Sequence, residues 1–156
     1  MKNNLFHIAQ FNIIKLKDEL DSPMILEFKD FLAPVNKLAE KSPGFIWRLK
    51  DDGGGSATNI ETPYKDKLIF VNLSVWLNFE DLENYVYRTV HGYFLKSRKK
   101  WGIKMEGYQS VLWWKQAGDH PTVMEGKTKL DLLNTIGSSP QAFSINEKYD
   151  NIGIKL

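Results

Sequence analysis

Residues 68–76 alternate between two kinds of side chain, and this alternation constrains the fold more strongly than any other feature of the sequence. One set of alternate positions is purely aliphatic and consists of Ile69, Val71, Leu73 and Val75. The other set mixes rings with an amide and a hydroxyl, and consists of Phe70, Asn72, Ser74 and Trp76. Because successive side chains of a strand point to opposite faces of a sheet, the segment is predicted to be a strand. Its aliphatic face belongs under helices, and its mixed face is expected to form a second interface or a cavity wall.

Six further segments carry strand or helix signals and complete an α+β order. Strands are predicted at residues 5–12, 45–50 and 108–116. Helices are predicted to begin after the capping residues Ser22, Asn78 and Thr122. The resulting order, βαββαβ followed by a C-terminal helix, predicts a ferredoxin-like fold with an antiparallel sheet.

The sequence also predicts several local features of this single domain, which spans residues 1–156 with a core of about residues 5–146. Pro34 lies inside the first helical pattern, so a kink or two short helices are expected there. The buried stripe of the second helix is predicted to be Leu82, Val86, Thr89 and Tyr93. A mobile loop is expected at residues 51–64, a short edge strand at 143–145 and a loose tail at 147–156.

The composition excludes several classes of function. The chain has 156 residues, 42% of them apolar, and its net charge of +2 is too small to indicate nucleic acid or an anionic membrane as an obligate partner. The basic run at residues 96–100 is therefore interpreted as the solvent face of a helix. The chain has no cysteine, which excludes disulfides, thiol catalysis and cysteine-ligated metals. No apolar run is long enough to span a membrane and the N-terminal residues are a poor signal peptide, so a cytoplasmic protein is expected.

A set of short motifs occurs in one order along the chain. They are residues 6–12, 36–40, 42–49 and 72–76, His91 with residues 98–101, residues 112–114, and residues 118–122 with Glu125. Together these motifs resemble the bacterial domain-of-unknown-function family 3291 over nearly the whole predicted core. The resemblance implies membership of the dimeric α+β-barrel superfamily, whose members are similar to antibiotic-biosynthesis monooxygenases.

This resemblance implies a function as well as a fold. The superfamily includes cofactor-free monooxygenases, haem-dependent enzymes and ligand-sensing domains, so a monooxygenase-like enzyme acting on a small conjugated or phenolic molecule in a ring-lined cavity is expected. The alternatives are a non-catalytic small-ligand-binding or sensing dimer and a haem-binding protein. No cofactor is predicted, although haem is left open. A homodimer through the ring-rich sheet face is expected, because that face would otherwise be an exposed apolar patch.

His91 and Arg98 are the predicted catalytic residues. They lie two turns apart on one side of a continuous helix. His91 would move a proton while Arg98 holds an anionic oxygen, or His91 would ligate haem iron while Arg98 binds a propionate. A purely structural role for both residues is the alternative. Because His7, His91 and His120 do not have the spacing of a metal site, no metal is predicted.

A further group of residues is predicted to bind the ligand, because small-molecule sites place a few polar groups among rings. The group consists of Arg48, Asn72, Trp76, Trp101 and Trp114. The polar members have a second interpretation as part of a polar and aromatic dimer interface. The tryptophans have a second interpretation as ordinary core residues.

Overall fold

A five-stranded antiparallel sheet lies at the centre of the computed structural model, which describes residues 5–19, 21–50, 62–88 and 98–156. The strands are β1 (Phe6–Leu16), β2 (Phe45–Arg48), β3 (Ile69–Trp76), β4 (Gly102–Ile103) and β5 (Ser110–Gln116). The helices are α1 (Leu26–Lys41), α2 (Phe79–Arg88) and α4 (Val123–Ile136), with a short 3₁₀ helix, η3 (Arg98–Lys100). The protein is therefore an α+β domain, as the sequence predicts.

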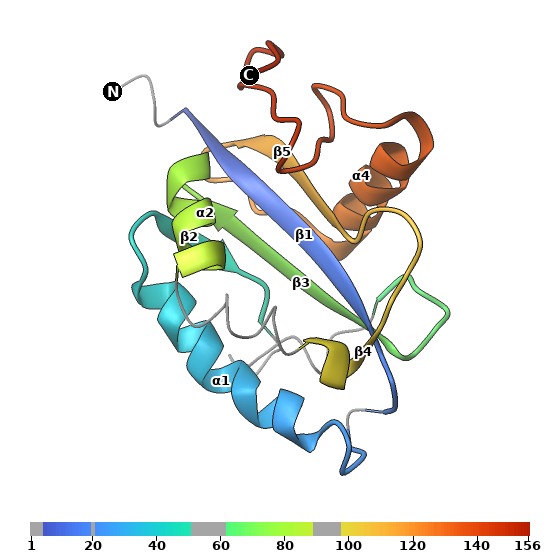
Figure 1. The fold of residues 1–156 in the computed structure, drawn as a ribbon. Coiled ribbons are helices and arrows are strands. Elements are labelled where there is room, and N and C mark those ends of the chain that lie inside the picture. The colour runs from blue at the N-terminus through green and yellow to red at the C-terminus, as the bar shows by residue number, and fades with distance from the viewer. Residues whose placement is uncertain (1–4, 20, 51–61, 89–97) are drawn as a thin grey trace.

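β1 is the central strand, and it runs diagonally between β3 and β5 (Figure 1). The order across the sheet is β2-β3-β1-β5, and β4 pairs with the last residues of β1 beside the end of β5. Every pairing is antiparallel. The short strand β4 and the helix η3 were not predicted, because neither segment has a hydrophobic period long enough to reveal it.

The two faces of the sheet are covered by different helices. On the aliphatic face, Leu130 and Leu133 of α4 pack in one cluster with Phe11 and with the predicted aliphatic residues of β3. On the mixed face, α1 and α2 pack over Trp76 and Ile8. The aliphatic face therefore lies under a helix as predicted, and the mixed face is covered as well.

This coverage removes the argument from which the homodimer was expected. Sheet residues of both faces are buried by helices of the same chain, including Trp76 and Trp113, each 1% exposed. Within the described part of the chain, no ring-rich sheet face is left open for a second copy to cover. The homodimer stays a prediction that depends on the family resemblance.

Two of the three predicted helix caps are confirmed. Thr122 Oγ1 accepts a hydrogen bond of 3.1 Å from the backbone N–H of Glu125, and Asn78 Oδ1 accepts one of 2.9 Å from that of Asp81. Ser22 instead holds a turn that precedes α1, where its hydroxyl accepts from Met24 N–H at 3.3 Å. Helix α1 consequently begins three residues later than the Ser22 signal indicates.

The expectation of two short helices at Pro34 is wrong, because α1 runs through Pro34 as one helix, and the alternative of a kink stays a prediction. Proline removes one backbone hydrogen bond from a helix interior. Four buried side chains spaced at helical intervals hold the helix against the sheet on both sides of it, namely Phe28, Leu32, Val35 and Ala39. Tertiary packing therefore outweighs the local cost of the proline.

The C-terminal residues are folded rather than loose. Tyr149 and Lys155 form an isolated antiparallel bridge, and the Asp150 carboxylate accepts a bond of 2.8 Å from Ile154 N–H. The Trp114 indole N–H donates to the Tyr149 carbonyl at 2.9 Å, which attaches this segment to β5. The expected edge strand at 143–145 is reduced to one bridge between Phe143 and Leu112.

Three smaller outcomes complete the comparison with the sequence. Strand β1 extends four residues beyond its predicted end. In α2, Tyr85 is buried beside Leu82, and Val86 is only half-buried. The predicted stripe residues Thr89 and Tyr93, and most of the predicted loop at 51–64, lie outside the described residues. No helix among the residues that the structure describes combines the length and the apolar content needed to cross a membrane.

Candidate functional site: a polar pocket beneath α1 and α2

Four hydrogen-bonding side chains form a polar patch on the otherwise apolar mixed face. They are Gln10 and Asn12 of β1 and Asn72 and Ser74 of β3, and we call them the amide floor. The register places Asn12 directly opposite Asn72 and Gln10 directly opposite Ser74. Directly opposed residues on one sheet face have Cβ atoms about 4.5–5.5 Å apart, so the four side chains are neighbours.

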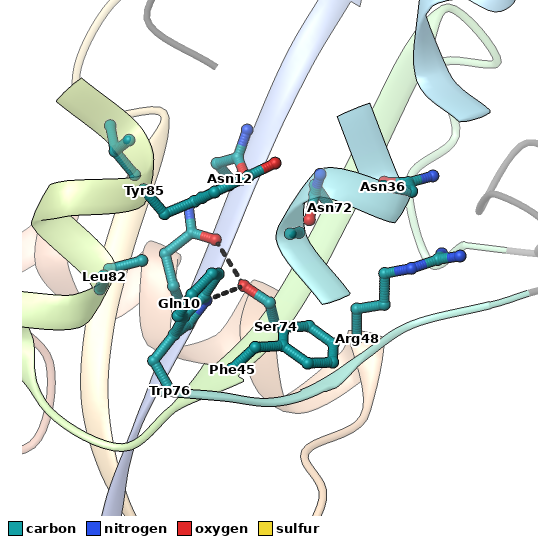
Figure 2. Close-up of a pocket in the computed structure, with 12 residues that line it drawn as sticks. Gln10, Asn12, Asn36, Phe45, Arg48, Asn72, Ser74, Trp76, Leu82 and Tyr85 are labelled. Carbon is teal, nitrogen blue, oxygen red and sulfur yellow. Dashed lines mark hydrogen bonds between the residues drawn. The ribbon is translucent and has the colours of Figure 1, made fainter. Parts of the chain in front are cut away.

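A directional chain of hydrogen bonds connects this floor. The Trp76 indole N–H donates to Ser74 Oγ at 2.9 Å, and the Ser74 hydroxyl donates to Gln10 Oε1 at 3.3 Å. Figure 2 shows the Ser74 hydroxyl between the other two side chains. The Gln10 amide nitrogen then donates to Asn12 Oδ1 at 2.9 Å. Each donor in the chain therefore has an acceptor.

Two adjoining cavities lie above the floor and share Gln10, Asn12, Leu82 and Val86 as lining residues. The smaller has a volume of about 30 Å³ and reaches β2 and α1. The larger has a volume of about 190 Å³ and is also lined by Tyr87, Leu112 and Ile145, with Gln109 and Ser110 at its polar side. The larger cavity therefore has mostly apolar walls, whereas Asn36 and Arg48 add polar groups to the walls of the smaller one.

Arg48 lies at the β2 side of the smaller cavity, opposite Ser74 in the sheet. Its Nε donates to Glu40 at 2.9 Å, and its side chain is only 10% exposed. Figure 2 shows this side chain running away from Gln10 and Trp76 toward the Asn36 side of the pocket. Burial acts to raise the pKa of Glu40, but hydrogen bonds and charges from Arg48 and Lys50 outweigh it and hold the pKa below its usual value.

Tyr85 forms part of the α2 wall. Its hydroxyl donates to the Val35 carbonyl at 3.2 Å, and its ring stacks on Trp76 with centroids 5.0 Å apart. Burial raises the pKa of Tyr85 well above its usual value, although the positive charge of Arg48 acts in the opposite direction. The phenol is therefore neutral at physiological pH and stabilises the wall as a hydrogen-bond donor.

The structure brings together three of the five predicted ligand-binding residues. Arg48, Asn72 and Trp76 all line the smaller cavity. Trp101 instead packs in a separate cluster, edge-on to Phe28 with centroids 5.5 Å apart. Trp114 packs edge-on to Phe79 at 5.1 Å and takes no part in either described cavity.

The predicted catalytic pair is not placed relative to this pocket. His91 lies outside the described residues. Arg98 begins η3, and its side chain also lies outside the description. The catalytic roles of both residues stay predictions.

Sequence reasoning missed Gln10, Asn12, Asn36 and Tyr85 as pocket residues. The signal for the first two was present, since they are the polar residues at alternate positions of an apolar strand. Their role depends on which strand pairs with theirs, and the sequence does not give that pairing.

The residues for which positions are described contain no group of three or more His, Asp or Glu side chains placed to hold one metal ion.

Comparisons with known proteins concern the whole fold. A protein of unknown function from Nitrosomonas europaea, NE2512, is similar with a TM-score of 0.47 and 11% sequence identity, over 76% of this chain and 96% of that chain. No curated protein matches the sequence. Residues 7–155 match the family described as a domain of unknown function, DUF3291. Because that match includes the floor strands, both pocket helices and the folded C-terminus, the protein described here is a member of the DUF3291 family.

Proposed function

We propose that the protein binds a small planar molecule in the larger cavity, between Gln10 and Asn12 of the amide floor and helix α2. One observation carries the proposal, namely the placement of four hydrogen-bonding side chains on a sheet face that helices cover. Turning polar groups toward a covered face is costly unless they gain hydrogen bonds, and apolar residues would pack there more favourably. A few polar groups that converge on an apolar cavity are typical of small-molecule sites.

The size of the larger cavity indicates the size of the ligand. Its volume is about 190 Å³. A cavity of about 150 Å³ in another protein accommodates benzene. A single ring with one substituent therefore matches this space, and the walls provided by Leu112 and Ile145 suit its apolar faces.

The proposal includes two further expectations, one about the topology of the fold and one about the chemistry of the site. We propose a ferredoxin-like topology, which is supported by the antiparallel order β2-β3-β1-β5 and by the packing of α1 and α2 over one face. Oxygenase chemistry would follow binding only with a group that accepts a proton, and His91 is the residue predicted for that role. Haem binding depends on the same histidine and remains the alternative.

The proposal is tested by titrating isotope-labelled protein with acetophenone, benzoate and benzylammonium while following the side-chain amide signals of Gln10 and Asn12. A saturable shift of these signals by at least one probe is expected. Ile145→Trp fills the larger cavity and is expected to abolish the shift. Ile136→Trp is the matched control, because Ile136 is 62% exposed and lies outside the cavity lining.

The failure of all three probes to shift these signals would overturn the proposed site, and so would binding that Ile145→Trp leaves unchanged. Circular dichroism of both variants checks that each remains folded. Oxygen uptake with quinols then separates an enzyme from a binding domain. Consumption that depends on His91 indicates oxygenase chemistry, and its absence with saturable binding indicates a sensor or carrier.

A further inference from the structure

We infer that the ligand presents a hydrogen-bond acceptor, a carbonyl or carboxylate oxygen, to the side-chain amide nitrogen of Asn12. This inference rests on the proposed function and specifies the chemistry of the ligand at that site. It follows from the direction of the hydrogen-bond chain, which turns Asn12 Oδ1 toward Gln10 and so leaves the Nδ2 group, a donor, on the side of the amide away from Gln10.

The direction of the chain is set at its buried end. An indole N–H only donates, so Ser74 Oγ accepts from Trp76, whose side chain is 1% exposed. The serine has one proton, and it goes to Gln10 Oε1. The amide of Gln10 is thereby oriented with its nitrogen toward Asn12 Oδ1. Each step of the chain fixes the next.

The reverse orientation of both amides is less favourable. Turning Gln10 over would place its NH₂ group against Ser74 Oγ, and the serine proton would lose its acceptor. Ser74 is 8% exposed, and among the described residues its hydroxyl donates only to Gln10. A buried donor without an acceptor is destabilising, so the observed direction is preferred.

Asn12 is the last residue of this hydrogen-bond chain, and it is the residue that we infer contacts the ligand. It lines both cavities, and its Oδ1 atom is engaged by Gln10. Because Oδ1 is turned toward Gln10, the Nδ2 group is the end of Asn12 that is presented to a molecule in the larger cavity. Asn72, directly opposite, lines only the smaller cavity and makes no side-chain hydrogen bond within the described residues.

The test compares probes that share one shape. Acetophenone and α-methylstyrene differ by replacement of the carbonyl oxygen with a CH₂ group, so their affinities isolate the acceptor. Acetophenone is expected to bind about tenfold more tightly, the effect of one buried hydrogen bond. Benzoate tests whether the acceptor is charged, and benzylammonium presents only donors and is expected to bind most weakly.

Asn12→Asp tests the residue itself. Gln10 can still donate to one carboxylate oxygen, and the second oxygen then replaces the donor that faces the cavity. The preference for acetophenone over α-methylstyrene is expected to disappear. Asn151→Asp introduces the same charge at an exposed position and is expected to retain the preference.

Gln10→Glu tests the direction of the chain at a second residue of the cavity lining and leaves Asn12 itself unchanged. At pH 8 the ionised glutamate accepts from both Ser74 and Asn12, so Asn12 is expected to turn its oxygen toward the cavity and the preference for acetophenone to be lost. Equal affinities for acetophenone and α-methylstyrene in the unmodified protein would overturn the inference while leaving the binding site intact. So would tighter binding of benzylammonium. Absence of binding by every probe would overturn the proposed function itself.

Discussion

The indole N–H of Trp113 donates a hydrogen bond of 2.8 Å to the carboxylate of Glu125, and this bond connects β5 to the first turn of α4. Lys115 donates to the other carboxylate oxygen at 3.2 Å. The helix that covers the aliphatic face is therefore anchored at its N-terminal end by one acidic side chain as well as by apolar packing.

Replacing Glu125 is expected to destabilise the protein. Glu125→Ala leaves the Trp113 N–H without its acceptor, and Trp113 is 1% exposed. The free energy of unfolding should fall by about 1–3 kcal/mol. Urea denaturation measures the loss, and Glu125→Gln is the matched control because its amide oxygen still accepts. Equal losses in the two variants would show that charge, rather than the hydrogen bond, provides the stabilisation.

Gly126 is expected to resist substitution because α4 lies very close to Phe11. A Cβ atom at Gly126 would lie 2.5 Å from Cδ1 of the Phe11 ring, which is fully buried. Alanine favours helices by about 1 kcal/mol over glycine, but overpacking costs about 1–3 kcal/mol. Gly126→Ala should therefore lower the free energy of unfolding.

A double-mutant cycle checks the cause of that loss. Phe11→Leu provides space for the new methyl group, so the double variant should lose less stability than the sum of the two single variants, by at least about 0.5 kcal/mol. Additive losses would locate the effect in the helix backbone and not in the contact with Phe11.

Tyr64 is expected to make stability fall at high pH. Burial, with a smaller effect from the charge of Asp131, raises the pKa of Tyr64 to about 12 from the usual 10.0. Between these values the unfolded chain loses the proton and the folded chain keeps it, so stability falls as pH rises. Tyr64→Phe should reduce this fall, as denaturation midpoints between pH 8 and pH 11 would reveal.

The same variant should not destabilise the protein at pH 7, because the buried Tyr64 hydroxyl has no hydrogen-bond partner within the described part of the chain. Tyr108→Phe is the matched control, since Tyr108 is 39% exposed. A clear loss of stability at pH 7 in Tyr64→Phe would indicate a partner for the hydroxyl, such as a bound water molecule.

Glu40 is expected to contribute to the fall in the free energy of unfolding at acidic pH. Its pKa is lowered in the folded state, so its contribution is present above the unfolded value of 4.5 and is lost as pH falls through the folded pKa. The difference in stability between the unmodified protein and Glu40→Gln should therefore shrink below about pH 4.5. Glu27→Gln removes an exposed pair with Lys100, with both side chains more than half exposed, and should change stability little at any pH.

Local sequence signals predicted most of the helices and strands correctly. The period of two in β3 and the capping residues Thr122 and Asn78 were sufficient to locate elements, because each signal acts within a few residues of the chain. Pro34 misled for the same reason. Its cost is local, whereas the packing that compensates for it comes from strands far away in the sequence.

The candidate site was predicted only in part, since it depends on register. Trp76 and Trp101 are both predicted to bind the ligand, yet one lines the pocket and the other lies in a separate core cluster. Gln10 and Asn12 form a polar patch only because Ser74 and Asn72 lie opposite them in the sheet. Pairing between distant strands determines these groupings, and one sequence contains no direct signal for it.

The two faces of the sheet differ in how they are packed. The face beneath α4 is apolar and tightly packed, down to the contact between Gly126 and Phe11. The face beneath α1 and α2 holds the amide floor and its cavities. Under the proposed function, substitutions in the floor would change the ligand without disturbing the α4 side. A family with this architecture would then keep one scaffold while its ligands diverge, and a ligand found for one member would not predict that of the next.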